Sequence, residues 1–220
     1  MIACPNCGEL SKDDIFIFNE GLRKQNFDHS PILPTCKKCA AEVVITNRCN
    51  GGNIIVLNGT CGSGKSTVAE ILAKRNFLAI DGDCVIQVVK HKRNGAKVDF
   101  QEQAVFEEIA HEIDILSMFG GNLVLSHVIM PEDLDRYIEI FNARNLKYWL
   151  FLLKPSYEVA VERCSTRTCH GNPSITPEYW IKHFYDALVF DNRVEVVDNT
   201  NMSPEQTTNF ILESCCLCEQ

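Results

Sequence analysis

The stretch that decides the fold runs from residue 53 to residue 75 and reads NIIVLNGTCGSGKSTVAEILAKR. Its apolar, β-branched run at 54–57 predicts a parallel strand buried on both faces. The spacing G-x-x-x-x-G-K-[ST] follows, which is the pattern of a phosphate-binding loop. The matching residues are Gly59, Gly64, Lys65 and Ser66. From Ser66 on, apolar residues recur at helical spacing, so we predict a strand, a glycine-rich loop and a helix.

Such a loop binds anions, because its backbone N–H groups and the helix dipole point at the same place. Lys65 would reach the β- and γ-phosphates, and the Ser66 hydroxyl would hold Mg²⁺. The predicted nucleotide contacts are Gly59, Thr60, Cys61, Gly62, Ser63, Gly64, Lys65, Ser66 and Thr67. The alternative is a chance match in an ordinary strand–turn–helix. We predict that the chain binds a nucleoside triphosphate.

Composition limits the class of protein. The 220 residues are 45% hydrophobic and 23% charged, which is ordinary for a globular chain of one or two domains. No apolar run approaches the ~20 residues of a membrane span, and no basic-then-apolar signal pattern opens the chain. We therefore expect a cytoplasmic protein without membrane contact. The net charge of -8 argues against broad nucleic-acid binding.

The cysteines near the N-terminus predict a metal site. Of twelve cysteines, Cys4 and Cys7 form one Cys-x-x-Cys pair and Cys36 and Cys39 another, with 28 residues between the pairs. Two such pairs supply the four thiolates of a tetrahedral Zn²⁺ site, and this spacing resembles a zinc ribbon or rubredoxin-like pair of knuckles. A redox dithiol and unligated cysteines are the alternatives. A four-cysteine site leaves no open position, so the zinc would stabilise the segment and not catalyse.

Two domains follow from this division. A polar, glycine-rich stretch at 48–53 is the expected linker. It separates a zinc-ribbon-like domain at 1–48, with a strand expected at 15–18, from a nucleotide-binding domain at 53–213. A cysteine-rich tail at 214–220 remains without an interpretation, either as a source of thiolates for a metal or as a disordered end.

An acid pair follows the second predicted strand, at 77–80. Asp81 and Asp83 come directly after it, at the strand end where ligands of open α/β sheets gather. One carboxylate can bind Mg²⁺, and the other can orient and deprotonate a hydroxyl. The alternative is a turn in which an aspartate caps the following helix at Cys84.

The phosphate-binding motif followed by Asp81-x-Asp83 resembles the small-molecule kinases of the P-loop superfamily. That group includes shikimate kinase, gluconate kinase, adenylylsulfate kinase and chloramphenicol phosphotransferase. The resemblance covers residues 53 to about 213. It implies ATP and Mg²⁺ as cofactors, with Asp81 linked to the metal and Asp83 facing the acceptor.

Other polar residues have two interpretations each. The basic run at 90–95 either holds an anionic acceptor or completes a helix end. Ser126 and His127 follow the predicted strand at 123–125, where many P-loop enzymes carry an acid, and His127 either reaches the acceptor or packs. Arg163 and Arg167 share a face of the helix capped by Ser156. They resemble the lid arginines of the same kinases, the alternative being two solvated arginines.

Further helices are predicted at 100–119, from 131 to about 144, at 177–190 and at 204–212, with strands at 148–153 and 194–198. The fold class is therefore α/β, a three-layer P-loop NTPase sandwich with a parallel sheet of about five strands, plus the small zinc-binding domain. Near the last strand, residues 198–200 are a weak candidate for contact with the base.

The predicted function is ATP-dependent transfer of the γ-phosphoryl group to a hydroxyl of a small-molecule acceptor. One alternative is a polynucleotide 5′-hydroxyl kinase whose zinc ribbon recruits RNA or DNA. Another is a non-catalytic ATP-binding adaptor. The sequence is compatible with a monomer and with a homodimer.

Overall fold

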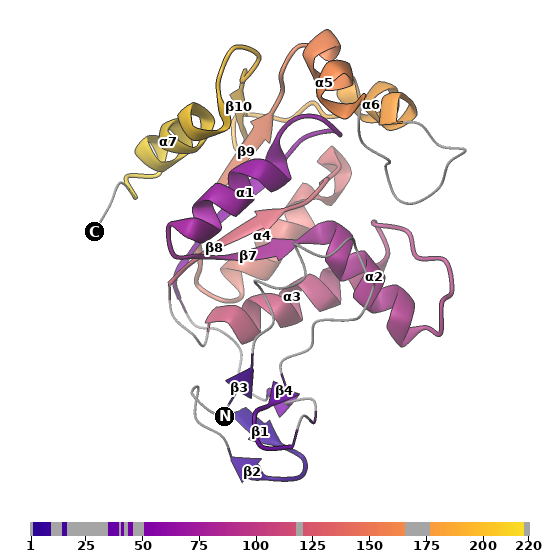
Figure 1. Ribbon diagram of the computed structural model, residues 1–220, viewed down its shortest axis with the longest axis vertical. Coiled ribbons are helices and arrows are strands. Elements are labelled where there is room, and N and C mark those ends of the chain that lie inside the picture. Colours follow the sequence, from indigo (N-terminus) through magenta and orange to yellow (C-terminus); the bar gives the residue numbers. More distant parts are fainter. Residues whose placement is uncertain are drawn as a thin grey trace.

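A computed structural model describes residues 2–9, 15–16, 35–39, 41, 44–45, 51–117, 121–165 and 177–217. Short strands near the N-terminus form a small unit at one end of the molecule, and an α/β domain follows (Figure 1). Within the described residues, no helix is long and apolar enough to cross a membrane.

The N-terminal unit consists of antiparallel pairs. β1 (Ile2–Cys4) lies between β2 (Gly8–Glu9) and β5 (Val44–Ile45), while β3 (Ile15–Phe16) pairs with β4 (Thr35–Cys36). The strand predicted at 15–18 is thus found over its first two residues, and residues 17–18 lie outside the described part. Tight turns after β1 and β4 carry the two Cys-x-x-Cys pairs.

The α/β domain is organised around a five-stranded sheet in the order β10-β9-β6-β8-β7, with every pair of neighbours parallel. Its strands are β6 (Asn53–Asn58), β7 (Phe77–Asp81), β8 (Asn122–Ser126), β9 (Lys147–Leu153) and β10 (Glu195–Val197). Parallel neighbours need crossover connections, which the intervening helices provide. The predicted parallel α/β sheet is confirmed.

Alternate residues of β6 enter two different cores, which explains the three layers. Ile54 and Val56 pack with α3 (Gln103–Ser117) and α4 (Leu134–Asn142) on one face. Ile55 and Leu57 pack with α1 (Lys65–Lys74) and α7 (Pro204–Ser214) on the other. Figure 1 shows α1 and α7 on the opposite side of the sheet from α3. Because both faces are buried, the strand has the continuous apolar run seen in the sequence.

The remaining helices lie near the carboxyl ends of the strands. They are α2 (Gly82–Lys92), the 3₁₀ turn η2 (Pro131–Asp133), α5 (Tyr157–Cys164) and α6 (Pro177–Tyr185). Ile181 of α6 packs against Ala160 and Cys164 of α5, whereas Phe184 of α6 joins the core of α3 and α4. α6 therefore connects the α5 side of the domain with the α3 side.

Two chain segments near the helix ends are informative. α2 ends at Lys92, within the predicted basic run and just before Asn94 and Gly95, which adopt positive φ angles of 54° and 85°. α6 ends at Tyr185, five residues earlier than predicted. The tail is also less separate than expected: Cys215 is 1% exposed in the core between α1 and α7, while Cys218 lies outside the described residues.

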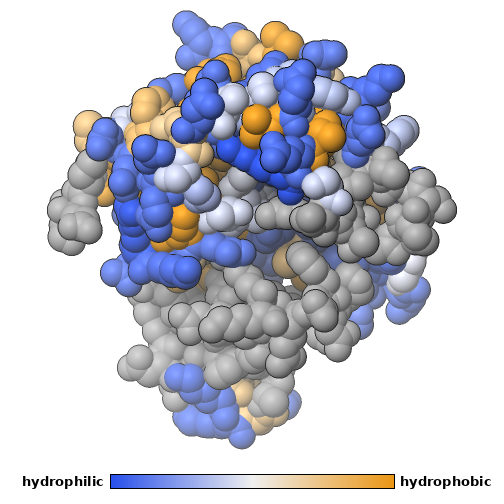
Figure 2. Space-filling model, turned by 45° about the horizontal axis from the view of Figure 1, so that its top comes forward, coloured by the Kyte–Doolittle hydropathy of each residue, from blue (hydrophilic) through white to orange (hydrophobic). Residues whose placement is uncertain are grey.

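A buried ion pair joins the end of α4 to α3. Arg144 donates to both carboxylate oxygens of Asp114, at 2.8 and 2.7 Å, and its carbonyl accepts from the N–H of Gly51. On the face drawn in Figure 2, hydrophobic residues form small patches between hydrophilic ones. Among the described residues of that face, no single broad apolar surface is visible.

Candidate active site

The loop between β6 and α1 depends on glycines. Gly59, Gly62 and Gly64 have φ angles of 141°, 75° and 96°, which L side chains rarely adopt. A Cβ on Gly59 would lie 2.5 Å from the Leu153 carbonyl oxygen, and one on Gly62 would lie 2.2 Å from that of Ala160. The loop therefore passes directly against β9 and α5.

Asn58 fixes this loop to the segment that follows β8. Its Oδ1 accepts from the N–H groups of Gly59 (2.7 Å) and Ile129 (3.1 Å), and its Nδ2 donates to the Ile129 carbonyl at 2.8 Å. The sequence analysis did not single out Asn58. A polar residue ending a buried strand just before the motif was the available signal.

Lys65 is the cation of the loop. Its Nζ donates to the carbonyl oxygens of Gly59 (2.6 Å) and Thr60 (3.1 Å). Burial lowers the pKa of Lys65, and the nearby Asp83 and Asp81 act in the opposite direction. The acid pair predicted from the sequence is therefore close enough to this ammonium to act on it electrostatically.

Asp81 and Asp83 hold different positions at the start of α2. Asp81 Oδ1 accepts from the N–H of Asp83 at 2.9 Å and from that of Cys84 at 3.4 Å, so it caps the helix as the structural alternative foresaw. Asp83 lies in the first turn and is exposed. Its carboxylate is therefore accessible to a bound molecule, and the roles of both aspartates in chemistry stay predictions.

His127, just after β8, lies against the same turn. It is 3% exposed, and a Cβ on Gly82 would lie 1.8 Å from its Nδ1. Burial lowers the pKa of His127 to about 4, while Asp83 has the opposite effect. Its Nε2 has no hydrogen-bond partner within the described residues. A neutral imidazole with an unpaired nitrogen thus lies beside the acid pair.

Arg163 borders a pocket on the other side of the loop. Its Nη2 donates to the carbonyl of Asn199 at 3.0 Å, and Asn199 Nδ2 donates to the carbonyl of Ser63 at 2.9 Å. The pocket has a volume of about 230 Å³. Its lining residues are Gly62, Gly64, Thr67, Val68, Arg163, Asn199, Met202, Pro204 and Thr207. Arg167, predicted to act with Arg163, lies outside the described residues.

The basic run after α2 is engaged in ion pairs. Lys92 contacts Glu108 at 2.7 Å, and Arg93 contacts Glu102. Both carboxylates come from the segment that forms α3 and its approach. For these two cations, the structure agrees with the structural interpretation of a helix end.

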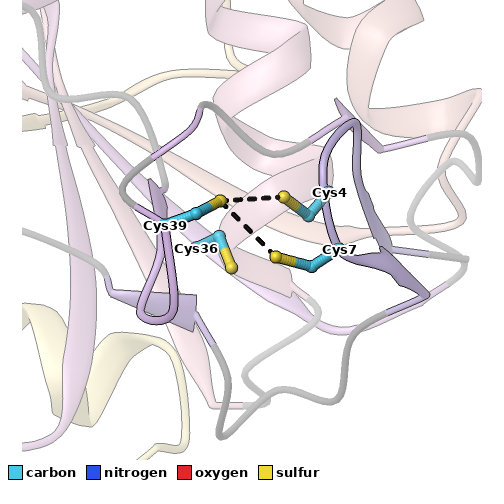
Figure 3. Close-up of side chains that lie close together, drawn as sticks. All are labelled: Cys4, Cys7, Cys36 and Cys39. Carbon is cyan, nitrogen blue, oxygen red and sulfur yellow. Dashed lines mark hydrogen bonds between the residues drawn. The ribbon is translucent and has the colours of Figure 1, made fainter.

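The four N-terminal cysteines meet at one point. The Sγ atoms of Cys4, Cys7, Cys36 and Cys39 all lie within 4.8 Å of one another, at 3.4 Å between Cys4 and Cys39 (Figure 3). Tetrahedral zinc with Zn–S bonds of about 2.3 Å needs sulfur atoms about 3.8 Å apart. The donor set therefore fits the zinc site predicted from the sequence. In the described ranges it is the one such group of potential metal ligands.

Comparison with known proteins identifies the family. A family model described as an AAA domain matches residues 55–179, which is more than half of the chain. The chain belongs to this AAA domain family. The match includes the phosphate-binding loop, the acid pair and Arg163.

Solved structures similar to the AAA domain protein include a tunicamycin resistance protein and a gluconokinase. The tunicamycin resistance protein of Deinococcus radiodurans is 19% identical, with a TM-score of 0.61 over 76% of this chain and 96% of that one. A gluconokinase from Sinorhizobium meliloti 1021 is 23% identical, with a TM-score of 0.52 over 77% and 94%. These similarities confirm the predicted P-loop kinase fold.

A curated relative is similar over part of the chain. The cytidylate kinase of Clostridioides difficile (strain 630) is 31% identical over 93 residues. The alignment spans 42% of this chain and 42% of that kinase, so less than half of either protein is compared.

Proposed function

We propose that this AAA domain protein transfers the γ-phosphoryl group of ATP to a hydroxyl of a small-molecule acceptor. The observation that carries the proposal is the meeting of Lys65, Asp83 and His127 at one edge of the sheet, within electrostatic reach of one another. A phosphate-binding cation, an exposed carboxylate and a polar group for the acceptor are the parts that hydroxyl phosphorylation requires.

The nucleotide would lie along the loop. Backbone N–H groups at the start of α1 would hold its phosphates, and Lys65 would exchange its contacts with the Gly59 and Thr60 carbonyls for phosphate oxygens. The pocket beside Arg163 and Asn199 would take the nucleoside. Arg163 would reach the phosphates as they become more charged, together with Arg167.

On the acceptor side, Asp83 would act as the base. Its carboxylate takes the proton of the acceptor hydroxyl, the oxygen attacks the γ-phosphorus in line, and ADP leaves. Mg²⁺ held by Ser66 and Asp81 would neutralise charge on the phosphate oxygens. One Asp81 oxygen already caps α2, which holds the carboxylate in a fixed place at the end of β7.

The N-terminal unit would have a separate task. Zinc bound by its four cysteines would fold this segment, which is too short to be stabilised by an apolar core of its own. No step of the proposed transfer involves it. Recruitment of a nucleic acid by this unit belongs to the polynucleotide kinase alternative.

A second candidate is transfer to a phosphate, as the name of cytidylate kinase describes for that relative. The 31% identity over 93 residues favours it. The ion pairs of Lys92 and Arg93 weigh against it, because these cations of the α2 end are already held by carboxylates.

The test is a transfer assay with γ-labelled ATP and Mg²⁺. Acceptors would be a pooled set of sugars, nucleosides and other hydroxyl compounds, cytidine monophosphate, and RNA and DNA with 5′-hydroxyl ends. We expect label on a hydroxyl of a small molecule, and none with the Lys65→Ala protein. Label only on cytidine monophosphate would establish the phosphate acceptor, and label only on oligonucleotides the polynucleotide kinase. Tight ATP binding without any transfer would identify an adaptor.

A further inference from the structure

Carboxylates crowd the acceptor side of the site. Glu108 is 7% exposed, with one oxygen paired to Lys92 and the other, Oε1, without a hydrogen-bond partner within the described residues. One turn further along α3, burial raises the pKa of Glu112 to about 8, and the charges of Glu108 and Asp81 add to this effect. Glu112 is therefore largely protonated at neutral pH, and the negative charge of this region comes from Asp83 and Glu108, so a further buried negative charge there is unfavourable.

The cations of this region do not offset the negative charge that an anionic acceptor would bring. Lys92 and Arg93 are paired with Glu108 and Glu102. Arg136 of α4 contacts Asp133 at 3.4 Å and lies over the ring of Phe106. Of the other cations in residues 82–117, Lys90 and Lys97 are exposed to solvent. An acceptor phosphate or carboxylate would meet carboxylates or would have to break these pairs.

His127 supplies the complementary observation. It is a buried, neutral group with an unpaired Nε2, and it lies within electrostatic reach of both Asp83 and Lys65. The ring of Phe100 packs edge-on against it at 6.5 Å and against Phe184 at 5.7 Å. A neutral imidazole can donate to or accept from a hydroxyl, whereas it offers no charge to an anion.

We propose that the acceptor is an uncharged hydroxyl compound with a ring, hydrogen-bonded by His127 and packed beside Phe100, and that the carboxylates of α2 and α3 reject anionic acceptors. The inference rests on the proposed function and specifies the substrate class of that site. A site that hydrogen-bonds its substrate and repels the charged analogue discriminates by attraction and repulsion together.

Two pairs of related compounds that differ in charge test this directly: cytidine against cytidine monophosphate, and glucose against gluconate, each with γ-labelled ATP. We expect kcat/KM for the uncharged member to exceed that for the anion by about tenfold or more in at least one pair. Preference for the anion in either pair, or label on none of the four compounds, overturns the inference. Label on an anion leaves the proposed phosphotransfer standing, whereas failure to bind ATP contradicts the proposed function itself.

Substitutions of His127 test whether this side chain binds the uncharged acceptor. His127→Leu should raise KM for the uncharged acceptor about tenfold or more with KM for ATP unchanged, and His127→Asn should recover part of the loss. His91→Leu is the matched control, because His91 is an exposed histidine in the last turn of α2. Unchanged KM in His127→Leu would overturn the role of His127.

The Glu108→Gln variant tests the repulsion of anionic acceptors while His127 stays unchanged. It removes one negative charge and leaves the Lys92 ammonium in place. The ratio of kcat/KM between the uncharged and the anionic member of each pair should therefore fall. If the preference for the uncharged member stays the same in this folded variant and in His127→Leu, the source of specificity lies elsewhere and the inference fails.

Discussion

The two sides of the phosphate-binding loop are built differently. On the proposed nucleotide side, backbone groups and one motif lysine would bind the phosphates, and Gly62 and Gly64 also line the pocket beside Arg163. On the acceptor side, side chains from three separate elements meet: Asp83 of α2, His127 after β8 and Phe100 before α3. A local motif therefore specifies the first side, whereas long-range packing creates the second. Variants on the two sides should separate nucleotide binding from acceptor choice.

The largest effect is expected from Lys65→Ala. Removing the ammonium that would bind the phosphates should lower transfer by about 10³-fold or more for every acceptor, because electrostatic stabilisation of the transferring group is lost. Lys74→Ala is the control, since Lys74 is an exposed lysine at the end of the same helix. Initial rates of label transfer measure both. A Lys65→Ala protein that retains a tenth of the activity would contradict the assignment.

Gly62→Ala should weaken ATP binding by about tenfold, because the new Cβ would lie 2.2 Å from the Ala160 carbonyl oxygen and force the loop away from α5. Gly95→Ala is matched to it: Gly95 also has a positive φ, of 85°, but nothing lies within 4 Å of its Cβ position. That control should lose about 1 kcal/mol of stability and no ATP affinity. Calorimetric titration measures the affinity of both variants for ATP. Equal affinities would contradict the prediction that only the substitution in the loop weakens ATP binding.

Glu112→Gln should change the pH dependence of stability. The pKa of Glu112 is raised from 4.5 to about 8 in the folded protein by burial, Glu108 and Asp81, with Lys92 opposing. Folding therefore binds a proton between these pH values, and stability from this group is full below about pH 4.5 and declines as pH rises towards 8. The variant should gain about 4 kcal/mol over the wild type at pH 8 compared with pH 4.5. Urea unfolding at both values measures this, and parallel pH curves would contradict it.

The smallest effect on transfer is expected from zinc removal. Cys36→Ser should lose the bound zinc and unfold the N-terminal unit, because a four-thiolate site holds such a unit together. The transfer rate should stay within about twofold, since the phosphate-binding loop and acid pair lie in the α/β domain. Cys216→Ser, at an exposed cysteine outside the four-thiolate group, is the control. Metal analysis and transfer assays check both, and loss of transfer with the zinc would link the unit to catalysis.

The same comparison explains what could be predicted from the sequence. The strand, loop and first helix were correct because the motif and the apolar run are local signals, and the Cys-x-x-Cys pairs likewise predicted a cluster that the structure contains. Asn58 was missed, and His127 was left between two interpretations, because their contacts with Ile129 and Gly82 depend on packing between strands. The end of α6 was predicted at residue 190, whereas the helix ends at Tyr185.

The most direct test of the central claim is Asp83→Asn in a single-turnover assay with γ-labelled ATP. The substitution keeps the shape of the side chain and removes the base that would take the acceptor proton. We expect ATP affinity within about threefold of the wild type and transfer slowed by about 10²-fold or more. Full transfer by a variant that binds ATP normally would contradict the assignment of this edge of the sheet as the site of phosphoryl transfer.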